Sequence, residues 1–407
     1  MRVTNRMLAN NFLTDMTTNL NNLQTLQQQL TSGKEIRRPS DDPLKVARAM
    51  QLHSEIGANK QYNENIKDTL SWLEQTDTAL GQLGDQTHRI RELLVSAGNV
   101  AYGTDERKKI NDEVKEIIGQ MSQTLNASFD GRFIFGGTRG TAKPVNVIKG
   151  PMVTKPQKSS DTAPDAKVTG SFNGKENIKY TVEIGYGENA TVTFKENGKE
   201  MTPQLNKTNN QWDLGNGIKF EIDGTVVNGS KYEFTALADG QTCLVYADRF
   251  GDKISQPEDI MSEKIVTEIS QGVRVEYNIT AVDVIKFNDG KDDRDLRIIL
   301  EDIVKHLESD DAEDIKKITN EDLAALDAVM DNILKLRSQV GAKGNRMESA
   351  LEKNKEENFN LTEILSKTED IDLVEKTMEY AVAISVYMAS LQTSARVLQP
   401  TLMDYVR

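Results

Sequence analysis

The sequence predicts an α+β protein in which long helices flank an inserted β-rich domain. Its nine prolines leave residues 44–143 and 258–399 free of proline. Because an interior proline removes a hydrogen bond and clashes with the preceding turn, such stretches permit long helices. Between them, the apolar residues change from a seven-residue to a two-residue period, which indicates strands. We therefore expect an elongated chain with coiled-coil-like terminal helices, a long antiparallel helical bundle and a β-rich outer domain.

The N-terminal arm shows the heptad spacing of packed helices. Its first predicted helix carries an apolar stripe made of two interleaved rows: Leu13, Met16, Leu20, Leu23 and Leu30. Gly33 suits the position just after a helix end. A second helix should begin at Asp42-Pro43, an N-cap acid followed by proline in the first turn. Gly103 should end it, and Thr104-Asp105 should cap the next helix.

The C-terminal arm has the same period. Residues 319–322 have the pattern of a capping box, which predicts that a helix starts there. Beyond it, apolar residues repeat every seven positions from Leu326 to Met347. The last helix carries two apolar rows, which are Val374, Ala381, Met388, Ala395 and Leu402, and then Ile384, Leu391, Leu398 and Tyr405.

The central region has the alternation of half-buried strands. From Ile178 to Tyr186 every second residue is apolar, and tight-turn dipeptides such as Asn197-Gly198 follow. A further strand is expected over residues 273–279, whereas residues 143–169 resemble a loop. We expect three divisions. Residues 1–42 and 371–407 form an inner assembly domain, residues 43–143 and 258–370 form a rod with a small β element near 273–285, and residues 144–257 form the inserted outer domain.

Composition excludes several classes of function. Acidic residues outnumber basic ones 63 to 50, so nucleic acid and anionic membranes are poor partners. The single cysteine, Cys243, excludes an intrachain disulfide, and the three histidines stand far apart, so no metal or cofactor site is expected. The most apolar stretch is too short to cross a membrane, and no secretory signal is recognisable. No nucleophile motif occurs, and nothing argues for an enzyme.

The distribution of charge distinguishes the two ends of the chain. From Met7 to Gly33 the only charged residue is Asp15, and from Tyr380 to Ala395 there is none. Helices exposed to water usually keep a charged outer face. We therefore expect these two helices to be covered on several sides by neighbouring molecules. The alternative is that they pair within one chain and expose neutral polar faces.

Three segments resemble a known family. The turn Ser32-Gly33-Lys34-Glu35-Ile36-Arg37-Arg38-Pro39-Ser40-Asp41-Asp42-Pro43 resembles the SGKRI signature, followed shortly by DDP, of bacterial flagellins and their hook-associated relatives. Glu35 stands where arginine is usual. The run NASFDGRFIFGG at residues 126–137 extends the resemblance. Residues 390–405, SLQTSARVLQPTLMDY, are similar to the end of the hook-associated members rather than to that of flagellin.

The resemblance implies an axial structural protein of the bacterial flagellum that joins the hook to the filament. It further implies export through the flagellar type III pathway and an extracellular location without a cleaved signal peptide. The implied partners are identical subunits in a ring, hook-associated protein 1 on the hook side, flagellin on the filament side, and an export chaperone at the C-terminal helix. A flagellin filament subunit is the first alternative. The second is a surface adhesin or an enzyme carried by the central β domain.

The same resemblance assigns the candidate site residues. The assembly interface is expected at the N-terminal stripe of Leu13, Met16, Leu20, Leu23 and Leu30, and at a partner row of Met388, Leu391, Ala395, Leu398, Leu402 and Tyr405. The signature turn of Ser32, Gly33, Pro39, Ser40, Asp41, Asp42 and Pro43 is expected to act mainly as a helix cap. The plain alternative for the two stripes is an intrachain core.

Overall fold

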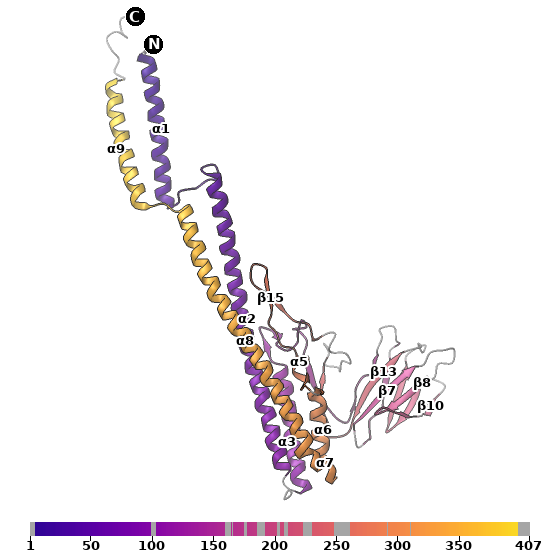
Figure 1. The fold of residues 1–407 in the computed structure, drawn as a ribbon. Helices are drawn as coiled ribbons and strands as arrows, with labels where there is room; N and C mark the ends of the chain where they lie inside the picture. The colour runs from indigo at the N-terminus through magenta and orange to yellow at the C-terminus, as the bar shows by residue number, and fades with distance from the viewer. Residues whose placement is uncertain are drawn as a thin grey trace. The chain divides into compact units, whose positions relative to one another are not determined.

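The computed structural model describes residues 5–98, 103–158, 164, 166–174, 177–184, 192–201, 204–206, 211–222, 230–247, 261–290, 292–309 and 311–397. The chain divides into two compact units (Figure 1). The terminal unit comprises residues 1–64 and 351–407, and the body unit comprises residues 65–350. Long helices combined with antiparallel sheets confirm the predicted α+β class.

The terminal unit is helical. Helices α1 (Asn5–Ser32) and α9 (Leu373–Val397) lie side by side, and the unit also holds the start of α2 (Pro43–Ala97) and the end of α8 (Leu323–Glu369). Gly33 follows α1 with φ of +70°, as predicted, and its N–H donates to the Gln29 carbonyl at 2.8 Å. The Asp42 carboxylate accepts from the N–H groups of Leu44 and Lys45, both at 3.1 Å, which confirms it as the N-cap of α2.

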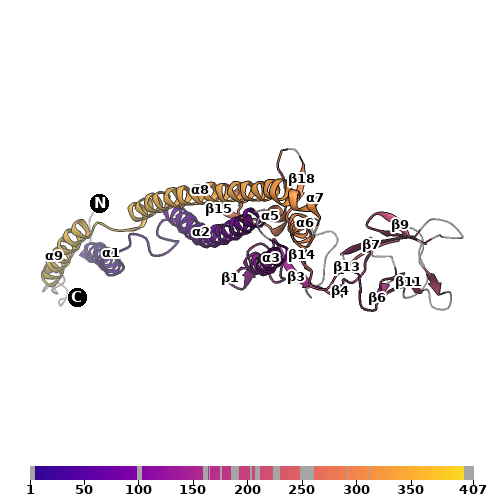
Figure 2. The ribbon, with the colours of Figure 1, turned by 90° about the horizontal axis from the view of Figure 1, so that it is seen from below.

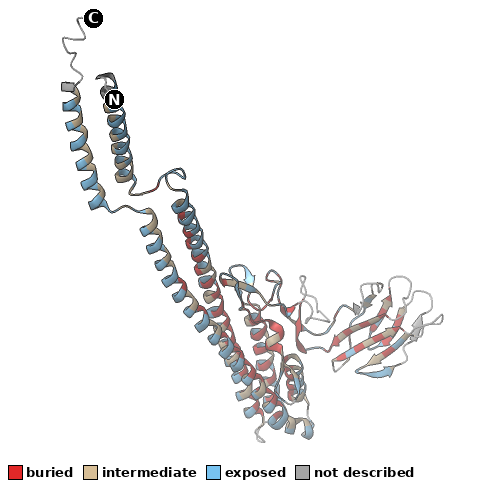
Figure 3. Ribbon diagram, turned by 45° about the horizontal axis from the view of Figure 1, so that its top comes forward, coloured by how far each residue is buried: buried red, intermediate tan, exposed pale blue. Residues whose placement is uncertain are grey.

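The body unit is built on an antiparallel pair of helices. Two ion pairs join α2 to α8: Arg91 Nε lies 2.7 Å from Asp327 Oδ1, and Arg337 Nε lies 2.9 Å from Asp77 Oδ1. The seam between them is apolar and buried, as the heptad spacing predicted (Figure 3). Its residues include Ile66, Leu73, Leu80, Leu83, Ile90 and Leu94 on α2, and Leu326, Val329, Ile333, Leu336, Val340 and Met347 on α8.

Two predicted helix starts are wrong. Residues 319–322 do not cap α8, because α7 (Ala312–Lys317), the π-helical turn η1 (Ile318–Asp322) and α8 follow one another without a break. The side chain of Asp322 is buried and lies 2.8 Å from His306 Nδ1 instead. Burial raises the pKa of this carboxyl group against the opposing hydrogen bond from His306. Helix α3 (Thr104–Leu125) is capped one residue earlier than predicted, at Gly103, whose N–H donates to Glu106 Oε2 at 3.1 Å.

The outer part of the body unit consists of two antiparallel sheets. The first has the order β10-β11-β12-β6, and the second has the order β4-β13-β7-β8-β9, with β5 also pairing with β13. The strands are β4 (Met152–Val153), β5 (Gln157–Lys158), β6 (Ala166–Thr169), β7 (Ile178–Ile184), β8 (Val192–Glu196), β9 (Lys199–Met201), β10 (Gln204–Asn206), β11 (Gln211–Gly215), β12 (Ile218–Ile222) and β13 (Lys231–Leu237).

The alternating pattern of the central strands places their apolar residues in one core between the sheets. Aromatic rings dominate it: Phe220 stacks on Phe234 with 5.7 Å between ring centroids, and Tyr180 stacks on Phe234 at 5.2 Å. The loop expected over residues 143–169 is wrong, because β3 (Val145–Lys149), β4, β5 and β6 occupy most of its described residues. These strands are short and contain few apolar residues, so their sequences do not show a two-residue period.

A two-stranded ribbon joins the outer sheets to the helices. It pairs β3 with β14 (Thr242–Tyr246), with Cys243 opposite Ile148. The ribbon packs against α3 and α6 (Leu296–Glu308) (Figure 2). At the same place Glu308 of α6 accepts hydrogen bonds from Asn111 and Lys115 of α3, at 3.0 and 2.6 Å, and from Gln241. The ribbon therefore belongs structurally to the helical body, although its residues lie inside the predicted insertion.

Small elements complete the body unit. They are β1 (Ser128–Phe129), β2 (Arg132–Phe133), β15 (Val266–Ser270), β16 (Val273–Glu276), α5 (Ala281–Ile285), β17 (Lys286–Asn288) and β18 (Asp293–Asp295). The strand predicted to reach Ile279 ends at Glu276. Thr280 then caps α5 by accepting from the N–H of Asp283 at 3.3 Å, which starts a helix where the alternation suggested more strand.

We predict that the outer sheets can be removed without unfolding the helices. Replacing residues 151–239 by a short Gly/Ser linker should preserve helical circular dichroism and cooperative melting, because the aromatic core lies within those residues. Replacing residues 144–247 removes the ribbon as well and should lower the melting temperature, since α3 and α6 lose the strands packed on them. Equal loss of cooperativity in both variants would contradict this boundary.

Candidate assembly surface

The two terminal helices pack through half-buried rows. The row on α1 is Phe12, Met16, Asn19, Leu23, Leu26 and Leu30, and the row on α9 includes Tyr380, Ala383, Ile384, Tyr387, Ser390 and Ser394. The alternating steps of three and four residues are those of a coiled coil. Among the described side chains of α1 and α9, none is fully buried. The pair therefore lacks the closed core that α2 and α8 form in the body unit.

Many apolar side chains of the same helices are exposed. They are Met7, Leu13 and Leu20 on α1, and Leu373, Val374, Met378, Val382, Val386, Met388 and Leu391 on α9. A shallow groove between the helices is lined by Leu26 of α1 and by Met378, Val382 and Val386 of α9. Apolar surface of this extent, in helices with few charges, is typical of an interaction surface.

The predicted interface residues divide between the two faces. Met16, Leu23 and Leu30 belong to the half-buried row of α1, whereas Leu13 and Leu20 are exposed. On α9, Met388 and Leu391 are exposed. Ala395 belongs to α9, but its side chain is outside the described residues, as are Leu398, Leu402 and Tyr405 altogether. The assembly role of these residues stays a prediction.

The intrachain partner of the α1 row differs from the row expected on α9. It is formed by Tyr380, Ile384 and Tyr387. The seven-residue spacing of the two tyrosines is the signal by which this row can be recognised in the sequence. Tyrosine suits a position between two helices that is half open to water, because its ring packs while its hydroxyl stays hydrated.

The signature turn connects α1 to α2 and contains two adjacent aspartates that accept hydrogen bonds from different parts of the backbone. Asp41 Oδ2 accepts from the N–H groups of Arg38 at 2.8 Å and Arg37 at 3.3 Å, and thereby closes the turn. The backbone hydrogen bond from Arg38 is the main reason why the pKa of Asp41 is lowered. Asp42 caps α2, and Pro43 occupies its first turn. Ser32, Pro39 and Ser40 are exposed.

The two linkers of the terminal unit are hydrogen-bonded to each other. We call residues 33–35 and 369–371 the linker clasp. The N–H of Glu35 donates to the Glu369 carbonyl at 2.6 Å, and the N–H of Ile371 donates to the Gly33 carbonyl at 3.1 Å. Lys34 and Asp370 are paired opposite each other as an antiparallel bridge.

Charged side chains reinforce the clasp. Lys34 Nζ lies 2.8 Å from Glu369 Oε1 and 3.5 Å from Asp370 Oδ1, and His53 Nε2 of α2 lies 3.0 Å from Glu369 Oε2. Partial burial raises the pKa of Glu369, but the hydrogen bonds with Lys34 and His53 outweigh it, so that this pKa is lowered from 4.5. Glu35, the departure from the usual arginine, pairs with Lys45 at 3.0 Å.

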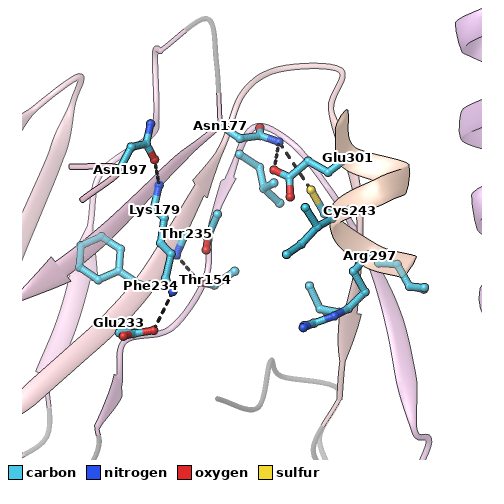
Figure 4. A pocket seen from close by; sticks show the side chains of 14 residues that line it. Thr154, Asn177, Lys179, Asn197, Glu233, Phe234, Thr235, Cys243, Arg297 and Glu301 are labelled. Carbon is cyan, nitrogen blue, oxygen red and sulfur yellow. Dashed lines mark hydrogen bonds and ion pairs between the residues drawn. The ribbon is translucent and has the colours of Figure 1, made fainter. Parts of the chain in front are cut away.

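The body unit contains a pocket between its outer sheet and α6 (Figure 4). The polar side chains around it already have partners. Asn177 Nδ2 donates to Glu301 Oε1 at 2.9 Å and contacts Cys243 Sγ at 3.5 Å, and Lys179 Nζ lies 3.0 Å from Glu233 Oε2. This arrangement ties the outer sheet to the ribbon and α6.

Within the described residues, no group of three or more His, Cys, Asp or Glu side chains is arranged to hold a metal ion. None of the helices in that part of the chain is long and apolar enough to span a membrane.

Comparison with known proteins finds similarity to flagellar proteins. The family model of the bacterial flagellin N-terminal helical region matches residues 3–139. A flagellin of Clostridium tyrobutyricum is 21% identical over 391 residues, covering 94% of this chain and 94% of that protein. Residues 3–139 are thus similar to the flagellin N-terminal helical region, and nearly the whole chain is similar in sequence to one flagellin.

Other flagellar proteins match only part of this chain. The flagellar hook-associated protein 3 of Salmonella typhimurium is 25% identical over 151 residues, which are 37% of this chain and 48% of that protein. The chain thus spans about half the length of this relative. The solved structure of flagellar hook-associated protein 3 from Legionella pneumophila covers 79% of this chain and 98% of its own, at 14% identity and a TM-score of 0.40.

We predict separate roles for the two acids of the signature turn. Asp42→Ala should speed amide exchange at Leu44 and Lys45 and cost about 1 kcal/mol of α2 stability, because it removes the cap. Asp41→Ala is the matched control and should instead speed exchange at Arg37 and Arg38. Hydrogen exchange resolved by residue checks this, and identical effects of the two variants would contradict it.

Proposed function

We propose that this chain is a structural axial protein of the bacterial flagellum, joins the hook to the filament, and assembles through α1 and α9. The observation that carries the proposal is the match of residues 3–139 to the flagellin N-terminal helical region, together with the exposed apolar residues on both terminal helices. A helix pair that lacks a buried side chain among its described residues gains stability when further helices cover it.

The choice of the junction over the filament rests on the C-terminal sequence. Residues 390–405 resemble the end of hook-associated proteins, and one relative is named hook-associated protein 3. A flagellin filament subunit is the second candidate, and the match to a flagellin over 94% of both chains favours it. Both candidates share the axial position and the use of the terminal helices, and they differ in which proteins lie next to the subunit.

The proposed partners follow from the position at the junction. They are further copies of this chain in a ring, hook-associated protein 1 on the hook side and flagellin on the filament side. An export chaperone would cover α9 before assembly, since its exposed apolar side chains require a partner during transit. The protein would reach the outside of the cell through the flagellar type III pathway.

A function carried by the outer sheets belongs to a different class. An adhesin or an enzyme would need a surface or pocket with groups left available for a ligand. The polar side chains of the pocket beside α6 are already hydrogen-bonded or ion-paired with one another. The relatives compared are flagellins and a hook-associated protein. We therefore assign the outer sheets to the exterior of an axial subunit.

Deleting the gene distinguishes the two axial roles. Loss of a junction protein should leave hooks that carry no filament, with flagellin shed into the medium. Loss of the filament subunit should remove the main filament protein from both cells and medium. Electron microscopy of the cells and gel analysis of the medium give both readouts. Normal filaments on the deletion strain would overturn the proposal in either form.

We predict that Leu391→Arg blocks assembly without unfolding the monomer. Leu391 is 42% exposed, so the monomer should change in stability by no more than about 0.5 kcal/mol. In the assembled state the added charge would be buried without a partner, which costs several kcal/mol. The strain should make and secrete the protein but carry few filaments.

Gln392→Arg serves as the control for this prediction. It adds the same charge to the neighbouring exposed position of α9 without removing an apolar side chain. Secreted protein is measured separately from filament number, because a failure of chaperone binding would lower secretion first. Normal filaments in the Leu391→Arg strain would remove this residue from the assembly surface.

A further inference from the structure

We propose that the hydrogen bond between Asn177 and Glu301 fixes the orientation of the outer sheets relative to the helices of the body unit, and that the outer sheets turn on the ribbon when this bond breaks. Asn177 and Glu301 are therefore positioning residues. Both lie within the body unit, so the inference needs no particular arrangement of the terminal helices. It goes beyond the proposed function, because it concerns movement inside one subunit and holds for a junction protein and a filament protein alike.

The first step is that packing alone does not hold the outer sheets in one orientation. The outer sheets enclose a core of their own, formed by side chains of β7, β8, β11, β12 and β13. In the described part of the chain, the extensive packing on α3 and α6 comes from β3 and β14 of the ribbon. Between the outer sheet and α6 lies a cavity of about 300 Å³ (Figure 4). A cavity of this size interrupts the close packing that makes protein interiors rigid.

The second step is that the chain connects the ribbon to the outer sheets through two neighbouring segments. It leaves the ribbon at residues 150–151 and returns at residues 238–241. The N–H of Gly150 donates to the Gln241 carbonyl at 2.9 Å, so the two segments lie side by side. Gly240 has φ of +77° and open space around its α-carbon, which suits a residue that absorbs changes in φ and ψ. Two adjacent connections form one hinge, and a third connection is required to fix its angle.

The third step is that the amide of Asn177 supplies this third connection. Asn177 lies directly before β7, and its Oδ1 accepts from the N–H of Ala238 at 3.0 Å. Its Nδ2 donates to Glu301 Oε1 at 2.9 Å and lies 3.5 Å from Cys243 Sγ (Figure 4). A thiol is a weak acceptor, whereas a hydrogen bond to a carboxylate is charge-assisted and stronger. The bond to Glu301 is therefore the main link from the start of β7 to α6.

The fourth step is that the charged side chains nearby are held by other partners. Arg297 of α6 donates to Asp295 through two nitrogens, at 3.0 and 2.6 Å, and its guanidinium carbon lies 4.4 Å from the ring centroid of Tyr246. Lys179 pairs with Glu233 inside the outer sheet. Because these pairs do not join the outer sheet to α6, they do not replace the bond between Asn177 and Glu301.

The test is small-angle X-ray scattering of the purified full-length protein. In Asn177→Asp one carboxylate oxygen still accepts from Ala238, whereas the other faces the Glu301 carboxylate and is repelled by it. The outer sheets should then sample several orientations, and the distribution of interatomic distances should become longer and broader. Glu301→Ala should have the same effect, because it removes the acceptor on α6. All variants share the same terminal segments, so differences between scattering curves report the outer sheets.

Exchanging the donor and the acceptor provides a rescue. The double variant Asn177→Asp/Glu301→Gln should restore the native curve, because the introduced glutamine amide donates to the introduced carboxylate. Glu301→Gln alone should change little, since its carbonyl oxygen still accepts from Asn177. Asn197→Asp is the matched control: Asn197 lines the same pocket, but its Oδ1 accepts from the N–H of Lys179 at 2.9 Å inside the outer sheet.

Tryptophan fluorescence distinguishes turning of the outer sheets from their unfolding. Trp212 is 7% exposed and packs against Phe194 and Phe220 in the core of the outer sheets. Its emission and the cooperative melting should stay native in every variant. A red shift of the emission in Asn177→Asp and Glu301→Ala would show that the sheets unfold instead of turning, and the proposal would then be wrong.

Two further results would overturn the proposal. Native scattering curves in Asn177→Asp and Glu301→Ala would show that the orientation is fixed without this hydrogen bond. Failure of the double variant to recover the native curve would show that Asn177 acts through a different contact. Each of these results leaves the axial role intact, since that role is tested by the deletion strain.

Discussion

The buried seam between α2 and α8 in the body unit is the interaction on which the rest of that unit depends. It removes a continuous row of leucine, isoleucine and valine side chains from water, and such burial is the main favourable contribution to folding. Helices α3 and α6 join the same helical body, the ribbon of β3 and β14 packs on them, and the outer sheets continue from the ribbon. The terminal unit differs in kind, because its helix pair leaves much apolar surface in water.

The sequence predicts those elements of the fold whose apolar residues recur at a regular spacing. Seven-residue spacing identified the seam from Leu326 to Met347, and alternation identified β7, because each pattern extends over several residues that are buried together. The caps at Asp42 and Gly33 were also predictable, since each depends on one residue type at one position. Long-range periodicity and local capping are the two signals that a single sequence carries well.

Predictions failed where a local pattern competed with tertiary contacts. Residues 319–322 resemble a helix start, yet the helical run continues through them because Asp322 turns to His306 on another helix. The half-buried row of α9 could not be recognised from its apolar residues for a related reason. Aliphatic residues suggest a core, but Tyr380 and Tyr387 occupy the half-buried face, and the aliphatic Met388 and Leu391 stay exposed. The clasp was not predictable at all, since it joins residues more than 300 positions apart through backbone groups.

The single cysteine has a practical consequence for studies of the body unit. Cys243 lies on β14 where the ribbon meets the outer sheet, is 8% exposed, and contacts Asn177. Its small exposed fraction, at the pocket between the outer sheet and α6, should slow its reaction with a thiol reagent, and the sequence contains no other thiol to compete for the reagent. The rate at which Cys243 of the native sequence is labelled therefore reports how accessible the joint between the ribbon and the outer sheet is, without an introduced probe.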